Sequence, residues 1–213
     1  MKAIVGQRIW LITAVVVALV VGLGVGLMVD RGGPESKVAG ESATAVDVGF
    51  AQDMSAHHQQ ALMMCDLLAP TAQPDVRALA AQIEQAQWRE IGQMQGWLQM
   101  LDAPLQATRP MSWMEAGGHQ HAAGVSTMPG MASGDELTRL SSADDVQSEI
   151  LFLQLMIRHH QVAIDMAAEA ARSAGEPAIR RAAVGMVKSQ SDEISVMTVM
   201  LDQRGGDTLP YPV

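Results

Sequence analysis

The sequence predicts an all-α protein, in which an antiparallel four-helix bundle made of two repeated helical hairpins follows one N-terminal transmembrane helix. Three observations predict this architecture: an uncharged apolar run near the N-terminus, a motif that occurs twice at a fixed offset, and apolar stripes with helical spacing in both repeats. Outside the apolar run alanine is abundant and β-branched runs are few, which favours helices over strands.

The apolar run covers residues 9–29 and contains no charged side chain. A helix of this length spans about 30 Å, the thickness of the hydrocarbon core of a bilayer. Lys2 and Arg8 precede it, so residues 1–8 are expected in the cytoplasm and the rest of the chain outside the cell membrane, in the periplasm or the extracellular space. A cleaved signal peptide is the alternative, but the run is too long and no small-x-small site follows closely. Residues 30–45 are rich in Gly, Ser, Pro and Ala and predict a flexible stalk.

The internal repeat defines the outer domain. Residues 50–64 match residues 152–166 at an offset of 102, and residues 87–94 match residues 190–197 at an offset of 103. Two matches in series indicate a helical hairpin that is used twice. Roughly two dozen residues per helix can bury one continuous core.

The predicted boundaries follow from the repeat and from the turn residues. Pro74 and Pro177 mark the hairpin turns. The bundle is expected over residues 46–204, as a hairpin at 46–101, a crossover at 102–144, and a second hairpin at 145–204, followed by a tail at 205–213.

The composition excludes several classes of function. The chain has 213 residues and a net charge of −9, which argues against nucleic acid as its partner. A single cysteine excludes a disulfide framework and a cysteine-only zinc or iron–sulfur site. No Walker loop, dinucleotide fingerprint or nucleophile–base arrangement appears, so a hydrolase or a nucleotide-dependent protein has little support, and a binding protein is favoured over an enzyme. The abundance of methionine, at 16 residues, is the unusual feature.

Polar residues interrupt the apolar stripes at symmetric positions: His57, Gln87, Glu90, His159, Gln190 and Glu193. Folding each hairpin about its turn places Gln87 level with His57 and Glu90 level with Met54, and the second hairpin repeats this pairing. By symmetry these residues should meet in one layer near a pseudo-twofold axis. A buried carboxylate without a partner costs several kcal/mol. The polar side chains of this layer must therefore hydrogen-bond to one another or bind a cation.

Two interpretations of the layer remain open. It could be a hydrogen-bond network that fixes the register of the bundle. It could also be a metal site, because di-iron bundle proteins carry Glu-x-x-His where this chain has Met54-x-x-His57 and Met156-x-x-His159. Thioether and imidazole ligands suit Cu(I) better than iron or manganese. A dinuclear iron or manganese oxidoreductase that uses the histidines with Glu90 and Glu193 is the alternative.

Two further features of the repeats concern possible ligands. His58 and His160 lie about 100° round each helix from the stripe, as either surface residues or additional ligands. Cys65 has Ala167 as its counterpart in the second repeat, which favours a structural thiol over a ligand.

The crossover, residues 102–144, is much longer than an ordinary connection. It has no clear helical periodicity, so core packing does not explain its soft donor residues. We expect mobile ligands that capture a soft cation, with a Met-rich loop lying over the bundle as the alternative: Met111, Met114, His119, His121, Met128 and Met131.

The paired Met-x-x-His-His-Gln motifs at residues 54–59 and 156–161 resemble those of the domain-of-unknown-function 305 family, which includes CopM-type periplasmic copper-binding proteins. Met-Pro-Gly-Met at 128–131 and the motif at 190–197 extend the resemblance to about residues 46–204. It implies a ferritin-like bundle and, for some relatives, copper binding. One departure is Ser55-Ala56 in the first motif, where the second has Ile157-Arg158.

The expected function is therefore a membrane-anchored extracytoplasmic protein that buffers Cu(I) or passes it to a partner protein, with a homo-oligomer as a further possible assembly. The inner ligands are expected to be Met54, His57, Met156 and His159. A structural or partner-binding bundle without metal is the third hypothesis.

Overall fold

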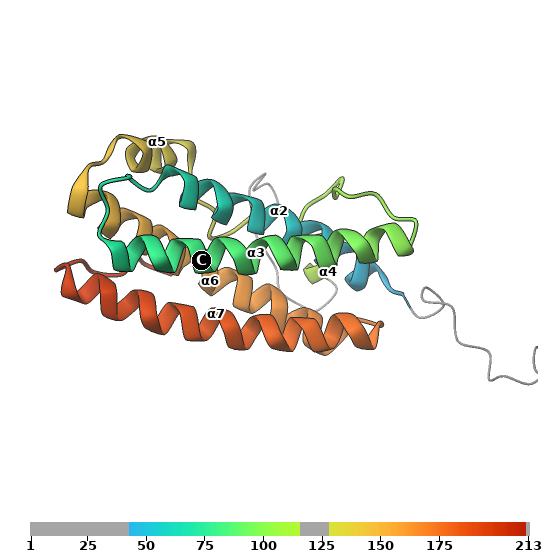
Figure 1. Ribbon diagram of the computed structural model, residues 1–213. Helices are drawn as coiled ribbons and strands as arrows, with labels where there is room; N and C mark the ends of the chain where they lie inside the picture. Colours follow the sequence, from blue (N-terminus) through green and yellow to red (C-terminus); the bar gives the residue numbers. More distant parts are fainter. Residues whose placement is uncertain (1–42, 116–127, 212–213) are drawn as a thin grey trace, which may run out of the picture. The chain divides into compact units, whose positions relative to one another are not determined.

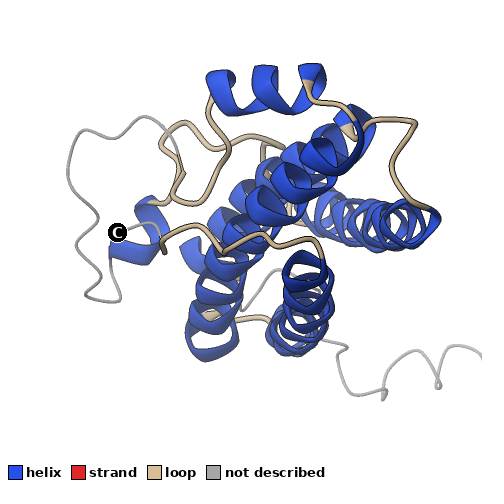
Figure 2. Cartoon of the chain, turned by 90° about the vertical axis from the view of Figure 1, so that its left-hand side faces the viewer, coloured by secondary structure: helices blue, strands red, loops and turns tan. Residues whose placement is uncertain are grey.

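The computed structural model describes residues 43–115 and 128–211, and every regular element in these ranges is a helix (Figures 1 and 2). The all-α prediction is confirmed for this part of the chain. Four helices are long and two are short: α2 (Ala45–Leu67), α3 (Pro74–Met100), α4 (Ser112–Glu115), α5 (Gly134–Ser142), α6 (Asp145–Ser173) and α7 (Pro177–Gln203).

The predicted membrane anchor at residues 9–29 lies outside the described residues, as do residues 1–8 and most of the predicted stalk. Within the described ranges, none of the helices has the length and apolar character that crossing a bilayer requires.

Local sequence explains where the long helices begin. α2 starts after Thr44, whose side chain and backbone form a capping box with Asp47. α3 and α7 start at Pro74 and Pro177, because proline has a helical φ and needs no hydrogen-bond acceptor in the first turn. The two helical hairpins thus turn just before these prolines.

The helices pack as two hairpins that meet mainly through one helix of each. α2 packs against α3, α6 packs against α7, and α2 crosses α6 between them (Figure 1). The crossover helices α4 and α5 both contact α2, and α5 also contacts α6. α2 and α6 are therefore the inner helices, and they carry the two Met-x-x-His-His-Gln motifs.

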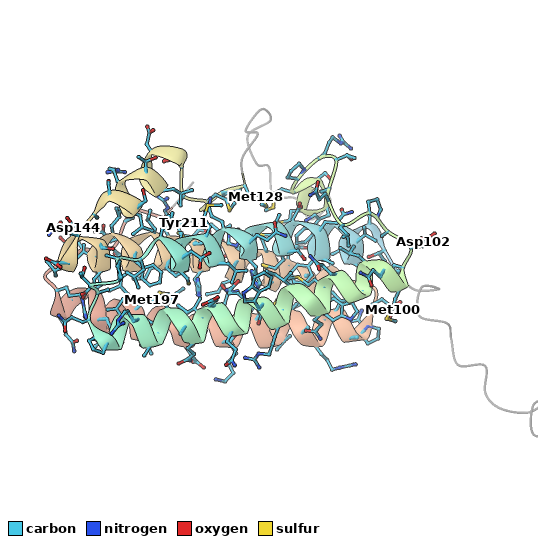
Figure 3. All side chains as sticks on the ribbon, turned by 45° about the horizontal axis from the view of Figure 1, so that its top comes forward. Met100, Asp102, Met128, Asp144, Met197 and Tyr211 are labelled. Carbon is cyan, nitrogen blue, oxygen red and sulfur yellow. The ribbon has the colours of Figure 1, made fainter. Side chains whose placement is uncertain are left out.

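The apolar core consists of two clusters related by the internal repeat, and side chains fill the space between the helices (Figure 3). Phe50 and Met54 of α2 belong to the first cluster, whereas their equivalents in α6, Phe152 and Met156, belong to the second. In α3, the cluster residues before the Gln-x-x-Glu segment belong to the second cluster, and those after it belong to the first. In α7 the order is reversed. The matching spacing of the two repeats thus places a polar layer between two apolar halves.

Each hairpin also supplies an acidic side chain that caps backbone N–H groups at the turn of the other hairpin. Asp47 at the start of α2 accepts hydrogen bonds from the backbone N–H groups of Gly175 and Glu176, both at 2.9 Å. Its equivalent in the repeat, Glu149, accepts from the backbone N–H of Gln73 at 2.8 Å. Both carboxylates are buried and satisfy N–H groups at the start of α7 and α3. This exchange fixes the two hairpins against each other.

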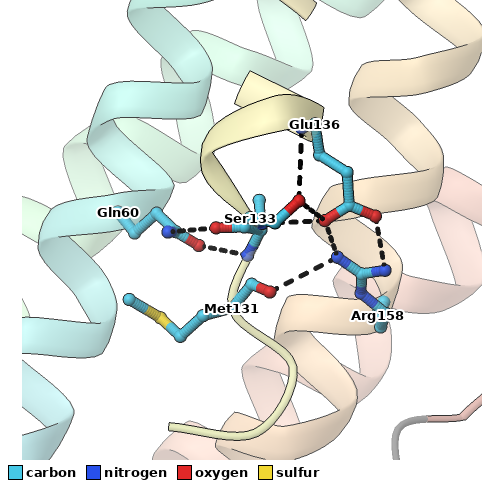
Figure 4. Close-up of polar contacts among 6 residues, drawn as sticks. Gln60, Met131, Ser133, Glu136 and Arg158 are labelled. Atoms are coloured by element: carbon cyan, nitrogen blue, oxygen red, sulfur yellow. Dashed lines mark hydrogen bonds and ion pairs between the residues drawn. The ribbon is translucent and has the colours of Figure 1, made fainter. Parts of the chain in front are cut away.

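The second half of the crossover is held to both inner helices (Figure 4). The Gln60 side chain donates to the carbonyl of Ala132 at 2.9 Å and accepts from its N–H at 2.6 Å. Arg158 donates to both carboxylate oxygens of Glu136, at 2.8 and 2.7 Å. Arg158 therefore anchors the crossover, which explains why the two motifs differ at this position, where the first repeat has the exposed Ala56.

Gly130 gives a test of this docking. Its φ is +76°, and an added Cβ would lie 2.5 Å from Cγ2 of Val162 on α6. We expect Gly130→Ala to lower the free energy of unfolding by about 1–3 kcal/mol, because the backbone conformation and the contact both oppose a side chain. Urea denaturation measures this change. Gly134→Ala, where nothing lies within 4 Å of the added Cβ, is the matched control, and an equal effect of the two substitutions would contradict the docking.

Candidate metal centre

Four histidines lie in the polar layer, and each is almost fully buried: His57 and His58 on α2, and His159 and His160 on α6. The rings of His57 and His159 lie against each other, with centroids 3.6 Å apart and an interplanar angle of 32°. His159 Nε2 is 3.0 Å from the backbone carbonyl oxygen of His57, to which it donates. The structure thus brings together the two histidines that the internal repeat predicts as partners.

The glutamates bind the second histidine of each pair. His58 Nε2 lies 2.7 Å from Glu90 Oε2, and His160 Nε2 lies 2.7 Å from Glu193 Oε2. The histidine side chains have no exposed surface, whereas the glutamates are 21% and 12% exposed. Glu90 and Glu193 therefore form the outer edge of the layer, with the histidines inside.

This pairing corrects two expectations. Glu90 lies level with His58 and not with Met54, so the predicted register of the hairpin is wrong by about one helical turn. The reason is the position of the turn, since α3 begins only at Pro74. His58 and His160, for which a surface position was open, are buried because the glutamates supply hydrogen-bond acceptors inside the fold.

Many nitrogen atoms of this layer have no hydrogen-bond partner. Among the described residues, the Nδ1 atoms of all four histidines and Nε2 of His57 are buried and unpartnered. Gln87 Oε1 and both polar side-chain atoms of Gln190 are also buried without a hydrogen-bond partner. Native proteins contain only a few such atoms per 100 residues. The layer is therefore poorly explained as a closed hydrogen-bond network that fixes register.

The electrostatic environment keeps the central imidazoles neutral. Burial lowers the pKa of His57 well below its usual value, and the neighbouring His58 and His160 lower it further. Burial and the surrounding histidines lower the pKa of His159 in the same way, against a smaller opposing effect of its hydrogen bond to the His57 carbonyl. A neutral imidazole is the form that binds metals.

The donor set fits a soft cation better than a dinuclear iron site. In the described part of the chain, no three side chains of His, Cys, Asp or Glu are arranged to hold a metal ion. Glu90 and Glu193 are engaged by His58 and His160 instead of lying beside the central pair. Met54 and Met156 are fully buried one helical turn before His57 and His159. Two imidazoles and two thioethers are ligands typical of Cu(I).

The crossover residues are placed differently from the prediction. Met111 and Met114 are only 7% and 4% exposed and belong to the first apolar cluster, so they are not mobile ligands. Met128 packs against the same cluster (Figure 3), and Met131 is half-buried with its carbonyl facing Arg158. The start of the crossover is held against α2, because Asp53 accepts hydrogen bonds from the Met111 N–H and from Trp113 Nε1. His119 and His121 lie outside the described residues.

Cys65 is a half-buried thiol on α2. Its Sγ lies 3.5 Å from the carbonyl oxygen of Ala80, to which the thiol donates. Burial, with a smaller contribution from nearby carboxylates, raises the pKa of Cys65 to about 12. The thiol is therefore protonated at neutral pH, which disfavours it as a thiolate ligand.

The model of the family described as domain of unknown function (DUF305) matches residues 47–201. A DUF305 protein from Streptomyces coelicolor is 37% identical with a TM-score of 0.70, and the match covers 78% of this chain and 97% of that one.

Two further solved structures are similar. A DUF305 fragment from Deinococcus radiodurans is 34% identical with a TM-score of 0.63, over 76% of this chain and 98% of that one. CopM in its Cu(I)-bound form is 27% identical with a TM-score of 0.58, over 75% and 98% of the two chains. No curated protein matches the sequence. The family match over most of the chain is decisive: this protein belongs to the DUF305 family.

Proposed function

We propose that this protein binds copper as Cu(I) at the central His57–His159 pair and serves to buffer it or pass it to a partner protein. The observation that carries this proposal is the pair of stacked, neutral imidazoles whose ring nitrogens, three of four, lack any hydrogen-bond partner. Met54 and Met156 add thioethers at symmetric positions. The similarity to CopM, which has structures in Cu(I)-bound and Cu(II)-bound forms, supports a role related to copper.

The residues of the layer would act on the ion in distinct ways. His57 and His159 would hold it through neutral nitrogen atoms, with Met54 and Met156 as soft ligands. The apolar clusters on both sides exclude water, which favours the lower charge of Cu(I) over Cu(II). Glu90 and Glu193 would not be ligands, because each already accepts a hydrogen bond from a flanking histidine. Instead they keep His58 and His160 in place beside the central pair.

The cellular setting is part of the same proposal. Residues 9–29 would anchor the chain in the cell membrane, and α2, α3, α6 and α7 would form a ferritin-like bundle on the extracytoplasmic side. This setting suits a protein that receives copper outside the cytoplasm. Protease treatment of intact cells or spheroplasts should digest the bundle and spare the first residues, and full protection of the bundle would contradict it.

Anaerobic titration of the full-length chain with Cu(I) against a chromophoric chelator tests the central site. We expect a dissociation constant below about 1 μM, and the loss of one equivalent of tightly bound Cu(I) in the double variant His57→Leu, His159→Leu. Met63→Leu, at an exposed methionine of α2, is the matched control and should bind as the parent does. A double histidine variant that keeps its full copper content would favour a purely structural layer.

A further inference from the structure

The crossover covers the two apolar clusters with different residues. Its first half contributes Met111, Trp113 and Met114 to the first cluster, and Met128, from its second half, packs against the same cluster. Its second half contributes Ala132, Leu137 and Leu140 to the second cluster. Since leucine fills the space over one cluster, packing alone does not require methionine over the other.

The long helices add to this difference in methionine content between the two clusters. In the first cluster, helices α2, α3, α6 and α7 add four fully or nearly fully buried methionines, which are Met54, Met94, Met166 and Met186. With Met111 and Met114 the first cluster contains six buried thioethers, and Met128 lies at its edge. The second cluster contains three, which are Met64, Met156 and Met197, and Met200 lies at its edge. Soft donors are thus concentrated in one half of a core whose framework is symmetric.

The structure holds the crossover methionines in place by an unusual arrangement. Asp53 Oδ2 accepts hydrogen bonds from the Met111 backbone N–H at 2.7 Å and from Trp113 Nε1 at 2.8 Å. Met111 has a φ of +63°, a conformation that non-glycine residues rarely adopt. The Met114 N–H donates to the Met111 carbonyl at 3.0 Å, which keeps the two methionines one turn apart. A buried carboxylate and an uncommon backbone conformation serve to fix a methionine pair, and such costly features often mark functional sites.

The symmetry of the repeat shows that the fold does not need this arrangement. The residue equivalent to Asp53 in α6 is Leu155, which is buried in the second cluster. The second cluster is therefore closed without an acid at this position of the repeat. Asp53, Met111 and Met114 are additions to the first cluster only.

We propose that the first cluster contains a second metal site, made of thioethers only, which takes a soft monovalent cation such as Cu(I) or Ag(I). Met111 and Met114 supply ligands from the crossover, and Met94 and Met166 supply thioethers from the bundle. Thioethers are neutral ligands that hard divalent cations bind weakly, so the site selects for soft ions. Met128, which is partly exposed and packs against the same cluster, would offer a thioether at the edge of the site.

This site is distinct from the His57–His159 pair, so the two proposals can fail separately. Native mass spectrometry of the full-length chain with Ag(I), a probe that does not change oxidation state, counts the ions. We expect two ions for the parent chain, and one each for Met111→Leu, Met114→Leu and for His57→Leu, His159→Leu. The double variant Met64→Leu, Met197→Leu is the matched control, since these residues are the equivalents of Met166 and Met94, and it should keep two ions.

Several results would overturn the second site. A Met111→Leu, Met114→Leu variant that still binds two ions excludes it, as does a parent chain whose only ion is lost in the double histidine variant. If the methionine variant does not fold, oxidation of the parent chain by hydrogen peroxide gives an independent answer. Bound Ag(I) should slow sulfoxide formation at Met111 and Met114 at least tenfold and leave the exposed Met63 unprotected, and unchanged rates at both residues would exclude the site.

Discussion

Acidification from pH 7 to pH 5 is expected to destabilise the fold steeply, and His57 and His159 are expected to be the main cause. Burial holds the pKa of both residues well below the ordinary value of 6.5. Above this value the histidines are neutral in the folded and the unfolded chain, and stability is unaffected. Below it the unfolded chain takes up protons that the folded chain excludes. Each histidine then removes about 1.4 kcal/mol of stability per pH unit, so the pair removes about 3 kcal/mol per pH unit.

Urea denaturation at pH 7, 6 and 5, followed by circular dichroism, measures this slope. In the double variant His57→Leu, His159→Leu the slope should fall by about the contribution of two protons. Met54→Leu, Met156→Leu is the matched control, because it changes the neighbouring buried residues without removing a titrating group. If the histidine variant loses stability with acid as steeply as the parent does, the buried pair is not the source of the acid sensitivity.

The contact between His57 and His159 could be predicted because the two histidines are equivalent residues of the internal repeat. Two copies of one motif at an offset of 102 residues place equivalent residues about a pseudo-twofold axis, and a residue near that axis meets its own counterpart. The same symmetry explains why the unpartnered ring nitrogens occur in pairs. The partner of Glu90 was harder to predict, because the register across a hairpin depends on where the second helix begins, and a small error in the turn displaces every pair.

A signal for the exchanged caps was present in the sequence. Asp47 and Glu149 are both acidic, lie at equivalent positions of the repeat, and stand in or near the first turn of α2 and α6. Their spacing could have indicated a pair of symmetric caps. Periodicity alone did not separate them from ordinary acidic residues at helix starts, which interact favourably with the helix dipole.

The crossover could not be predicted because its position depends on contacts between residues far apart in the sequence. Asp53 and Trp113 are 60 residues apart, and no period connects them. The methionine content of this segment indicated soft ligands, but it could not show that Met111 and Met114 are buried. Composition predicts which chemistry a segment offers, whereas burial depends on the partner that holds it.

Replacement of Asp53 by leucine is expected to cause the largest loss of stability among single substitutions in the crossover contact. Asp53 is 2% exposed, and its Oδ2 accepts hydrogen bonds from both the Met111 N–H and Trp113 Nε1. Leucine accepts no hydrogen bond, so two buried donors would lose their partner. At about 1–3 kcal/mol for each, the expected loss is about 2–6 kcal/mol. Equilibrium urea denaturation measures the loss.

Asp53→Asn separates the hydrogen bonds from the charge. The amide oxygen can accept both bonds in place of Oδ2, and burial already raises the pKa of Asp53 by disfavouring the charged form. We therefore expect Asp53→Asn to stay within about 1 kcal/mol of the parent chain. Trp113 packs edge-on against Phe50 at a centroid distance of 5.9 Å. With the other three tryptophans replaced by phenylalanine, its fluorescence should shift to longer wavelength in Asp53→Leu and remain unchanged in Asp53→Asn. Equal stability of the two variants would mean that the crossover is held by apolar packing alone, and Met111 would then have no fixed position over the first cluster.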